Sequence, residues 1–195
     1  MSLGVRVNGL RQAIRRDDVR SLSRRYFVAN GFDGTLTSIG VVVGAYLSGV
    51  ANGLAVVGIG LGAAVGLGTS GIWSVWEIER AEASLEQAEL ERSMLTSLDD
   101  TKLTRDLRNE QIVYSLAAAS GPVIGVAVTL LPFLLEGVLF SMVQAVLVSI
   151  GLGIVLLGGV GAYLGAISQQ RWFVAAARMG LAGIVVALIS IFLPG

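Results

Sequence analysis

Residues 53–76 read GLAVVGIGLGAAVGLGTSGIWSVW, a run of twenty-four positions without one charged side chain. A helix needs about 20 mostly apolar residues to cross the roughly 30 Å of hydrocarbon in a bilayer. A helix on the surface of a soluble protein would instead carry polar residues along one face. This run therefore predicts a membrane-spanning helix.

Similar runs lie on both sides of it. We place five spans, at residues 26–48, 53–76, 111–135, 138–167 and 172–193. Only 14% of the chain is charged, against about 25% in a typical soluble domain. The predicted fold class is an all-α, multi-pass integral membrane protein. Residues 1–25 form a basic amphipathic segment, and residues 26–195 form the five-helix membrane domain.

The basic residues predict the topology. Seven lie in residues 1–25, five lie in the polar stretch 77–110, and two, Arg171 and Arg178, begin the last span. With five spans, all three groups fall on the same side of the membrane. Because cytoplasmic segments are enriched in Lys and Arg, we expect a cytoplasmic N-terminus and an external C-terminus. Residues 77–110 then form a short acidic, helical insert in the cytoplasm between spans two and three.

The first half of that insert carries a stripe of carboxylates. At 100° per residue, its members fall within about 80° of one another on a helix. They are Glu79, Glu82, Glu86 and Glu89. A divalent cation with oxygen ligands would relieve their repulsion. Spacing alone favours a solvated acidic face, partly paired with Arg80 and Arg92. Further on, Asp99, Asp100 and Thr101 are placed to cap a short second helix before span three.

Asp33 lies about two turns into the first span, near Thr35 and Thr37. An ionisable side chain at such a depth costs roughly 2.5 kcal/mol or more on insertion scales, so it should face a partner or a water-filled cavity. One interpretation is a cation or proton site on a transport path that includes the two threonines. The other is a structural ion pair with Arg178. The residues themselves favour the two equally.

Other features narrow the possibilities. The chain has no Cys and no His, which excludes disulfides, thiolate zinc sites, cysteine nucleophiles and histidine bases. Its net charge is zero, so no basic bias points to a nucleic-acid partner. We also expect no enzymatic activity and no tightly bound cofactor.

Ser141, Gln144 and Ser149 in span four predict hydrogen bonds between helices. Glycines four residues apart predict close packing, mostly within one chain. These pairs are Gly40/Gly44, Gly58/Gly62, Gly62/Gly66, Gly121/Gly125 and Gly161/Gly165.

The stretch Arg25-Tyr26-Phe27-Val28-Ala29-Asn30-Gly31-Phe32-Asp33-Gly34, continuing to Gly44-Ala45-Tyr46-Leu47-Ser48-Gly49, resembles the first helix of the vacuolar iron transporter (VIT1/CCC1) family. Five spans, an acidic insert after span two, Leu130-Leu131-Pro132 and Arg178-Met179-Gly180 agree with that family. The resemblance covers roughly residues 24–194 and identifies a divergent member.

The resemblance implies a homodimer in the bilayer, with an ion path between the subunits lined by the first helices. It implies export of Fe²⁺ or Mn²⁺ from the cytosol in exchange for protons. Asp33 matches the family's membrane aspartate. The glutamate stripe resembles its metal-collecting helix, so Asp33, Glu79, Glu82, Glu86 and Glu89 are the expected metal ligands.

The chain departs from the family in span two. Leu67 stands where a Met is usual, and Gly71 stands where a Glu is usual. These departures support two alternatives, a transporter of a different substrate and a non-transporting membrane scaffold or interaction protein.

Overall fold

In the part that the structure describes, the regular secondary structure is α-helical, and an isolated β-bridge joins Glu136 and Phe140. The computed structural model describes residues 3–98 and 101–192, and these form six α-helices. Five of them are long and apolar enough to cross a membrane, in agreement with the number of predicted spans. The six helices confirm the predicted all-α class. The helices are α1 (Leu3–Arg15), α2 (Asp17–Leu47), α3 (Gly53–Met94), α4 (Lys102–Leu134), α5 (Met142–Ile167) and α6 (Trp172–Phe192).

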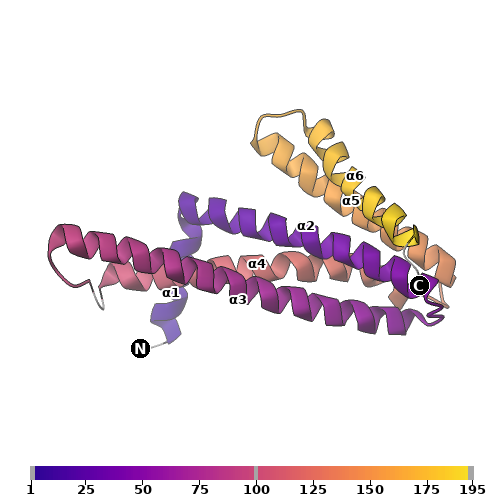
Figure 1. Ribbon diagram of the computed structural model, residues 1–195, viewed down its shortest axis with the longest axis horizontal. Helices are drawn as coiled ribbons and strands as arrows, with labels where there is room; N and C mark the ends of the chain where they lie inside the picture. The colour runs from indigo at the N-terminus through magenta and orange to yellow at the C-terminus, as the bar shows by residue number, and fades with distance from the viewer. Residues whose placement is uncertain (1–2, 99–100, 193–195) are drawn as a thin grey trace.

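The helices form a long bundle and a hairpin (Figure 1). Helices α2, α3 and α4 run alongside one another, and α4 packs extensively against both of the others. Helices α5 and α6 pair as an antiparallel hairpin. The hairpin lies close to the bundle where α2 ends and α5 begins, and diverges from it toward the α5–α6 turn. The bundle and the hairpin are therefore in contact mainly at one end.

Glycines allow α2 and α4 to approach closely. A Cβ atom added to Gly125 would lie 2.5 Å from Thr35 Oγ1 and 3.1 Å from the Gly31 carbonyl oxygen. Added Cβ atoms on Gly34 and Gly121 would meet the backbone of the facing helix. Side chains larger than hydrogen would separate the two helices at this crossing, so the prediction of close intramolecular packing is confirmed for Gly121 and Gly125.

The other glycine pairs differ. Gly161 and Gly165 pack against the start of α6, as expected. By contrast, Gly44 on α2 and three glycines of α3 have nothing within 4 Å of an added Cβ. The three are Gly58, Gly62 and Gly66. For these four the prediction of packing within the chain is wrong, because the faces that carry them point away from the neighbouring helices.

Buried hydroxyls connect α2, α4 and α5. Ser38 and Thr129 share a hydrogen bond, and Ser149 Oγ donates to the Thr129 carbonyl oxygen at 2.5 Å. All three side chains are almost completely buried. The prediction of an interhelical hydrogen bond is therefore confirmed for Ser149. It is wrong for Ser141 and Gln144, which form a capping box at the start of α5.

Two predicted boundaries are wrong. Helix α5 begins at Met142 and not at residue 138, because the chain turns at Gly137, which has a φ of 81°. Helix α4 runs without interruption from Lys102 to Leu134, so no separate short helix precedes span three. Thr101 caps it, its side chain accepting from the Thr104 amide. Asp99 and Asp100 lie outside the described residues.

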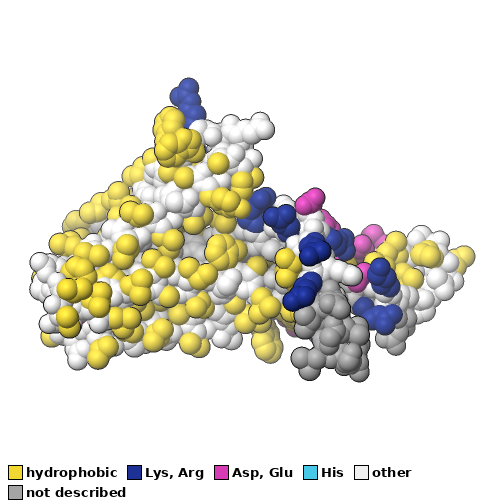
Figure 2. Space-filling model, turned by 180° about the vertical axis from the view of Figure 1, so that it is seen from behind, with side chains coloured by type: hydrophobic (Ala, Val, Ile, Leu, Met, Phe, Trp, Pro, Cys, Tyr) yellow, Lys and Arg dark blue, Asp and Glu magenta, His cyan; other side chains and the backbone are white. Residues whose placement is uncertain are grey.

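Charged side chains collect toward one end of the molecule (Figure 2). On the face shown, hydrophobic side chains cover the other end, and most of the Lys, Arg, Asp and Glu side chains gather beyond them, while a Lys or Arg side chain stands apart at the top of the view. We call this the charged end. It includes the hairpin extension, made of residues 77–94 of α3 and 102–110 of α4, which continues both helices past their apolar parts. The separation of charge predicted from the sequence is therefore present in three dimensions.

Candidate functional site

Asp33 is exposed on α2, on a face that no other helix of the chain covers. Thr37, one turn further along, is exposed as well and shares this face. Thr35 points the opposite way, toward α4, where it is buried and its Oγ1 donates to the Gly31 carbonyl oxygen at 2.8 Å. The structure therefore brings Asp33 and Thr37 together and separates Thr35 from them.

Arg178 on α6 is also exposed. Within residues 9–98 and 101–192, neither Asp33 nor Arg178 takes part in an ion pair. The carboxylate is thus open to whatever surrounds this face of the chain: lipid, a cation or a second protein surface. The open glycine Gly44 lies further along the same helix.

The glutamate stripe divides into two parts. Glu79 is 8% exposed, whereas Glu82, Glu86 and Glu89 are exposed to solvent. In the part of the chain that is described, no group of three or more Asp, Glu, His or Cys side chains is arranged to hold one metal ion. The stripe therefore presents separate carboxylates along one helix rather than an assembled site in the single chain.

Glu79 connects three helices at the base of the hairpin extension. Tyr26 on α2 donates its hydroxyl to Glu79 Oε1 at 2.6 Å. Gln111 on α4 donates Nε2 to the Glu79 carbonyl oxygen at 3.3 Å. Burial raises the pKa of the Glu79 carboxyl above its ordinary value; the hydrogen bond from Tyr26 opposes this shift and the charge of Glu82 adds to it. Glu79 is therefore an anchored carboxyl at the point where the helices leave the apolar region.

A second carboxyl holds the N-terminal segment. Arg16, at the bend between α1 and α2, contacts Glu110 at the start of the apolar part of α4, with Nη1 2.5 Å from Oε1. Arg16 also pairs with Asp18 at 2.8 Å. Burial raises the pKa of the Glu110 carboxyl, and the Arg16 guanidinium acts against that increase. This contact attaches the basic segment to the bundle.

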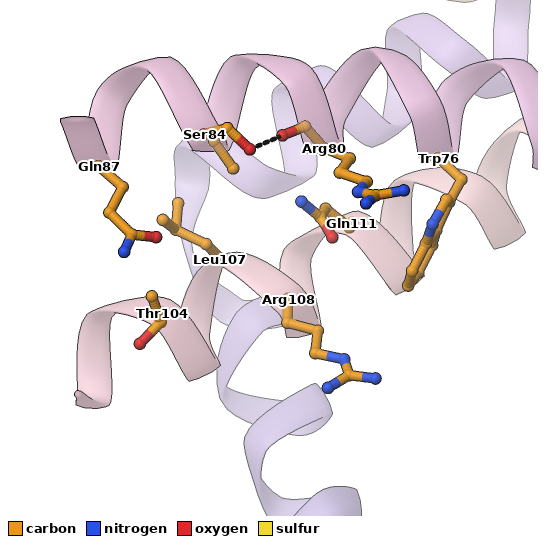
Figure 3. A pocket seen from close by; sticks show the side chains of 9 residues that line it. Trp76, Arg80, Ser84, Gln87, Thr104, Leu107, Arg108 and Gln111 are labelled. Atoms are coloured by element: carbon orange, nitrogen blue, oxygen red, sulfur yellow. Dashed lines mark hydrogen bonds between the residues drawn. The ribbon is translucent and has the colours of Figure 1, made fainter. Parts of the chain in front are cut away.

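A cavity of about 350 Å³ lies between the two helices of the hairpin extension (Figure 3). The described residues of its wall include no acidic side chain. Its lining consists of two arginines, an indole, amides, hydroxyls and apolar groups: Trp76, Arg80, Ala83, Ser84, Gln87, Thr104, Leu107, Arg108 and Gln111. Arg80 and Arg108 contribute positive charge to this lining, and Arg80 also pairs with Glu77 at 3.7 Å. Any cation collected by the extension would therefore meet the outward-facing glutamates rather than the space between the helices.

Gly71 occupies a position with no room for a side chain. A Cβ there would lie 3.0 Å from the Ala118 carbonyl oxygen of α4. Pro122, four residues after Ala118, has no N–H, so the helix leaves this carbonyl without its usual partner. Close packing of α3 on the carbonyl explains the glycine at this position. The chain offers no carboxylate at this depth of α3.

Sequence reasoning missed the residues that organise the charged end. The sequence patterns predict no hydrogen-bond or ion-pair partner for Tyr26, Arg16, Glu110 or Gln111. A signal was present, because a polar residue at a span boundary has both an apolar and an aqueous neighbour and tends to be hydrogen-bonded there. Their partners lie 32 to 94 residues away in the sequence, and the spacing within each helix does not reveal them.

Comparison with known proteins gives similarity over most of the chain without a function. No protein-family model matches it. An uncharacterized protein of Methanocaldococcus jannaschii is 29% identical over 168 residues, which cover 85% of this chain and 85% of that protein. A continuous stretch that covers 85% of this chain must include at least part of each of the helices α2 to α5. The chain is thus similar, through most of its membrane domain, to an archaeal protein of uncharacterized activity.

Proposed function

We propose that this protein transports a divalent metal cation, Fe²⁺ or Mn²⁺, across the membrane as a transporter of the vacuolar iron transporter type. The observation that carries the proposal is Asp33, a carboxylate exposed on the apolar part of α2 and without an ion pair among the described residues. A charge exposed to lipid is costly, and intramembrane carboxylates mark ion and proton pathways. A divalent cation supplies the counter-charge.

The proposed functional unit is a homodimer that covers the open face of α2. Small residues let membrane helices approach closely, and the face of α3 with Gly58, Gly62 and Gly66 is also unoccupied in the single chain. Two copies of Asp33 would then line one path, with Thr37 beside each. Thr35 has no part in this path, because its hydroxyl is committed to the α2 backbone.

The direction of transport follows from the proposed orientation. The basic segment, the hairpin extension and the start of α6 carry all fourteen Lys and Arg residues, so the positive-inside rule puts the charged end in the cytoplasm. The N-terminus is then inside and the C-terminus outside. The exposed carboxylates of Glu82, Glu86 and Glu89 would raise the local cation concentration. Asp33 would bind the cation, and protonation of Asp33 from the outer side would release it.

A second candidate is a membrane scaffold without transport activity. It is favoured by Gly71, where the packing of α3 on α4 excludes a ligand side chain, and by Leu67, which has no ligand atom. The same features also fit a transporter for another substrate.

The deciding experiment is metal flux into proteoliposomes, with Fe²⁺, Mn²⁺ and Co²⁺ compared with and without a pH gradient. Asp33→Asn should abolish flux while the variant stays folded. Glu136→Gln is the matched control, because Glu136 is a carboxylate in the turn between α4 and α5, far along the chain from α2. Equal flux through wild type and Asp33→Asn contradicts the proposal, as does the absence of flux for all three metals.

A further inference from the structure

A cavity lies between α2 and α5. Along these helices the α5–α6 hairpin diverges from the bundle (Figure 1). The cavity has a volume of about 750 Å³, within the roughly 300–1,000 Å³ of typical small-molecule sites. We call it the wedge. Its lining comes from three helices: Ser23, Arg24, Phe27 and Val28 of α2, Ala117 of α4, and Val155, Leu156, Gly159, Val160 and Tyr163 of α5.

Polarity changes along the wedge. Arg24 lies just before the apolar part of α2, and Tyr163 lies near the end of α5, four residues before Ile167. The other end of the wall, from Phe27 and Val28 across to Val155, is apolar. Val155 lies eight residues from Tyr163, or about 12 Å along the helix axis. The wedge therefore has a polar mouth at the charged end and an apolar interior directed into the bilayer.

Among the described side chains, Arg24 has no anionic partner. It takes part in no ion pair with any residue of the ranges 9–98 and 101–192. A guanidinium binds phosphate strongly because its donors match the phosphate oxygens. The mouth of the wedge is thus complementary to an anion, and its interior is complementary to hydrocarbon.

We propose that the wedge is a binding site for one anionic phospholipid of the leaflet at the charged end. Its phosphate contacts Arg24, with the Tyr163 hydroxyl close to the headgroup, and one acyl chain lies along Phe27, Val28 and Leu156. The phosphate of a phospholipid would lie at the polar mouth of the wedge, and its acyl chain would lie against the apolar interior. The bound lipid fills the gap between the bundle and the α5–α6 hairpin. This site requires only that the chain lies in a bilayer and is independent of cation transport.

The test measures lipid binding to the full chain purified in detergent. Native mass spectrometry counts the lipids retained during titration with phosphatidylglycerol or with phosphatidylcholine of identical acyl chains. Arg24→Gln is compared with Arg25→Gln, which removes the same charge from the adjacent exposed position outside the wedge. We expect phosphatidylglycerol affinity about tenfold lower for Arg24→Gln than for Arg25→Gln, the size of one lost charge-assisted hydrogen bond. Equal affinities overturn the proposal.

A second pair of variants tests the interior. Gly159 lines the wedge, and an added Cβ there meets nothing within 4 Å, so Gly159→Phe can fill the space without a backbone clash. Gly151→Phe is the control, because Gly151 is an equally open glycine on α5 outside the wedge. Gly159→Phe should lose the retained phosphatidylglycerol, and Gly151→Phe should keep it.

Two further outcomes overturn the proposal. Retention of phosphatidylglycerol by Gly159→Phe at the wild-type level would show that the interior is not used. A change of oligomeric state in Gly159→Phe, seen as an altered mass of the complex, with lipid retention unchanged, would assign the wedge to a second copy of the chain. If Gly159→Phe does not fold, as judged by circular dichroism, the arginine pair decides the matter. A failed flux experiment leaves every one of these outcomes unchanged.

Discussion

Replacement of Gly125 by alanine tests whether the close approach of α2 and α4 stabilises the fold. The added Cβ would lie 2.5 Å from Thr35 Oγ1, about 0.9 Å short of the 3.4 Å at which ordinary contact begins. Neither helix can yield easily at this point, because the Gly31 carbonyl oxygen lies 3.1 Å from the same Cβ and already accepts the Thr35 hydroxyl. Overpacking of this kind costs about 1–3 kcal/mol.

The control is Gly151→Ala on α5, where an added Cβ has nothing within 4 Å. Alanine favours helix over glycine by roughly 1 kcal/mol, so this variant should be unchanged or slightly more stable. The assay is unfolding in detergent, followed by the fluorescence of the three tryptophans. Gly125→Ala should be less stable than Gly151→Ala by about 1–3 kcal/mol or more. Equal stability of the two variants would refute the packing argument.

Three further predictions concern hydrogen bonds. Tyr26→Phe removes the donor to Glu79 and should lower the free energy of unfolding by about 1–3 kcal/mol in the same assay. The pKa of Glu79 is raised in the folded state, so the folded protein keeps a proton that the unfolded chain releases. The free energy of unfolding of the wild type should therefore increase as the pH falls toward 4.5. Glu79→Gln should show a smaller increase over the same pH range. Ser149→Ala breaks the bond to the Thr129 carbonyl and should cost about 0.6 kcal/mol, measured by unfolding at constant pH.

The spans could be predicted because a bilayer requires a long uncharged run, and that requirement is written in one continuous stretch of sequence. The ends of the spans are harder to predict than the spans themselves. The turn before α5 depends on Gly137 and on the capping box of Ser141 and Gln144, and both lie within an apolar stretch that reads as helix. Hydropathy does not distinguish an apolar turn from an apolar helix.

The glutamate stripe shows that the spacing of residues along one helix does not predict the burial of each side chain. Helical spacing correctly places Glu79 on the same side as Glu82, but it does not reveal that Glu79 is buried. That burial comes from Tyr26 and Gln111, which approach from two other helices. The environment of each carboxylate is therefore a tertiary property, and only the three outer glutamates keep the solvated character that the spacing favours.

Identical glycine spacing has opposite consequences in different helices, and this contrast bears on function. Gly121 and Gly125 lie against α2, whereas a Cβ added to Gly58, Gly62 or Gly66 would meet no described atom within 4 Å. Each glycine weakens a helix by roughly 1 kcal/mol relative to alanine, and close contact with a second helix would offset that cost. The charge of Asp33 in the apolar part of α2 is also costly, and a nearby counter-charge would offset it. A second copy of the chain enclosing a cation would offset both costs, which is why the dimer and the transport path are proposed together.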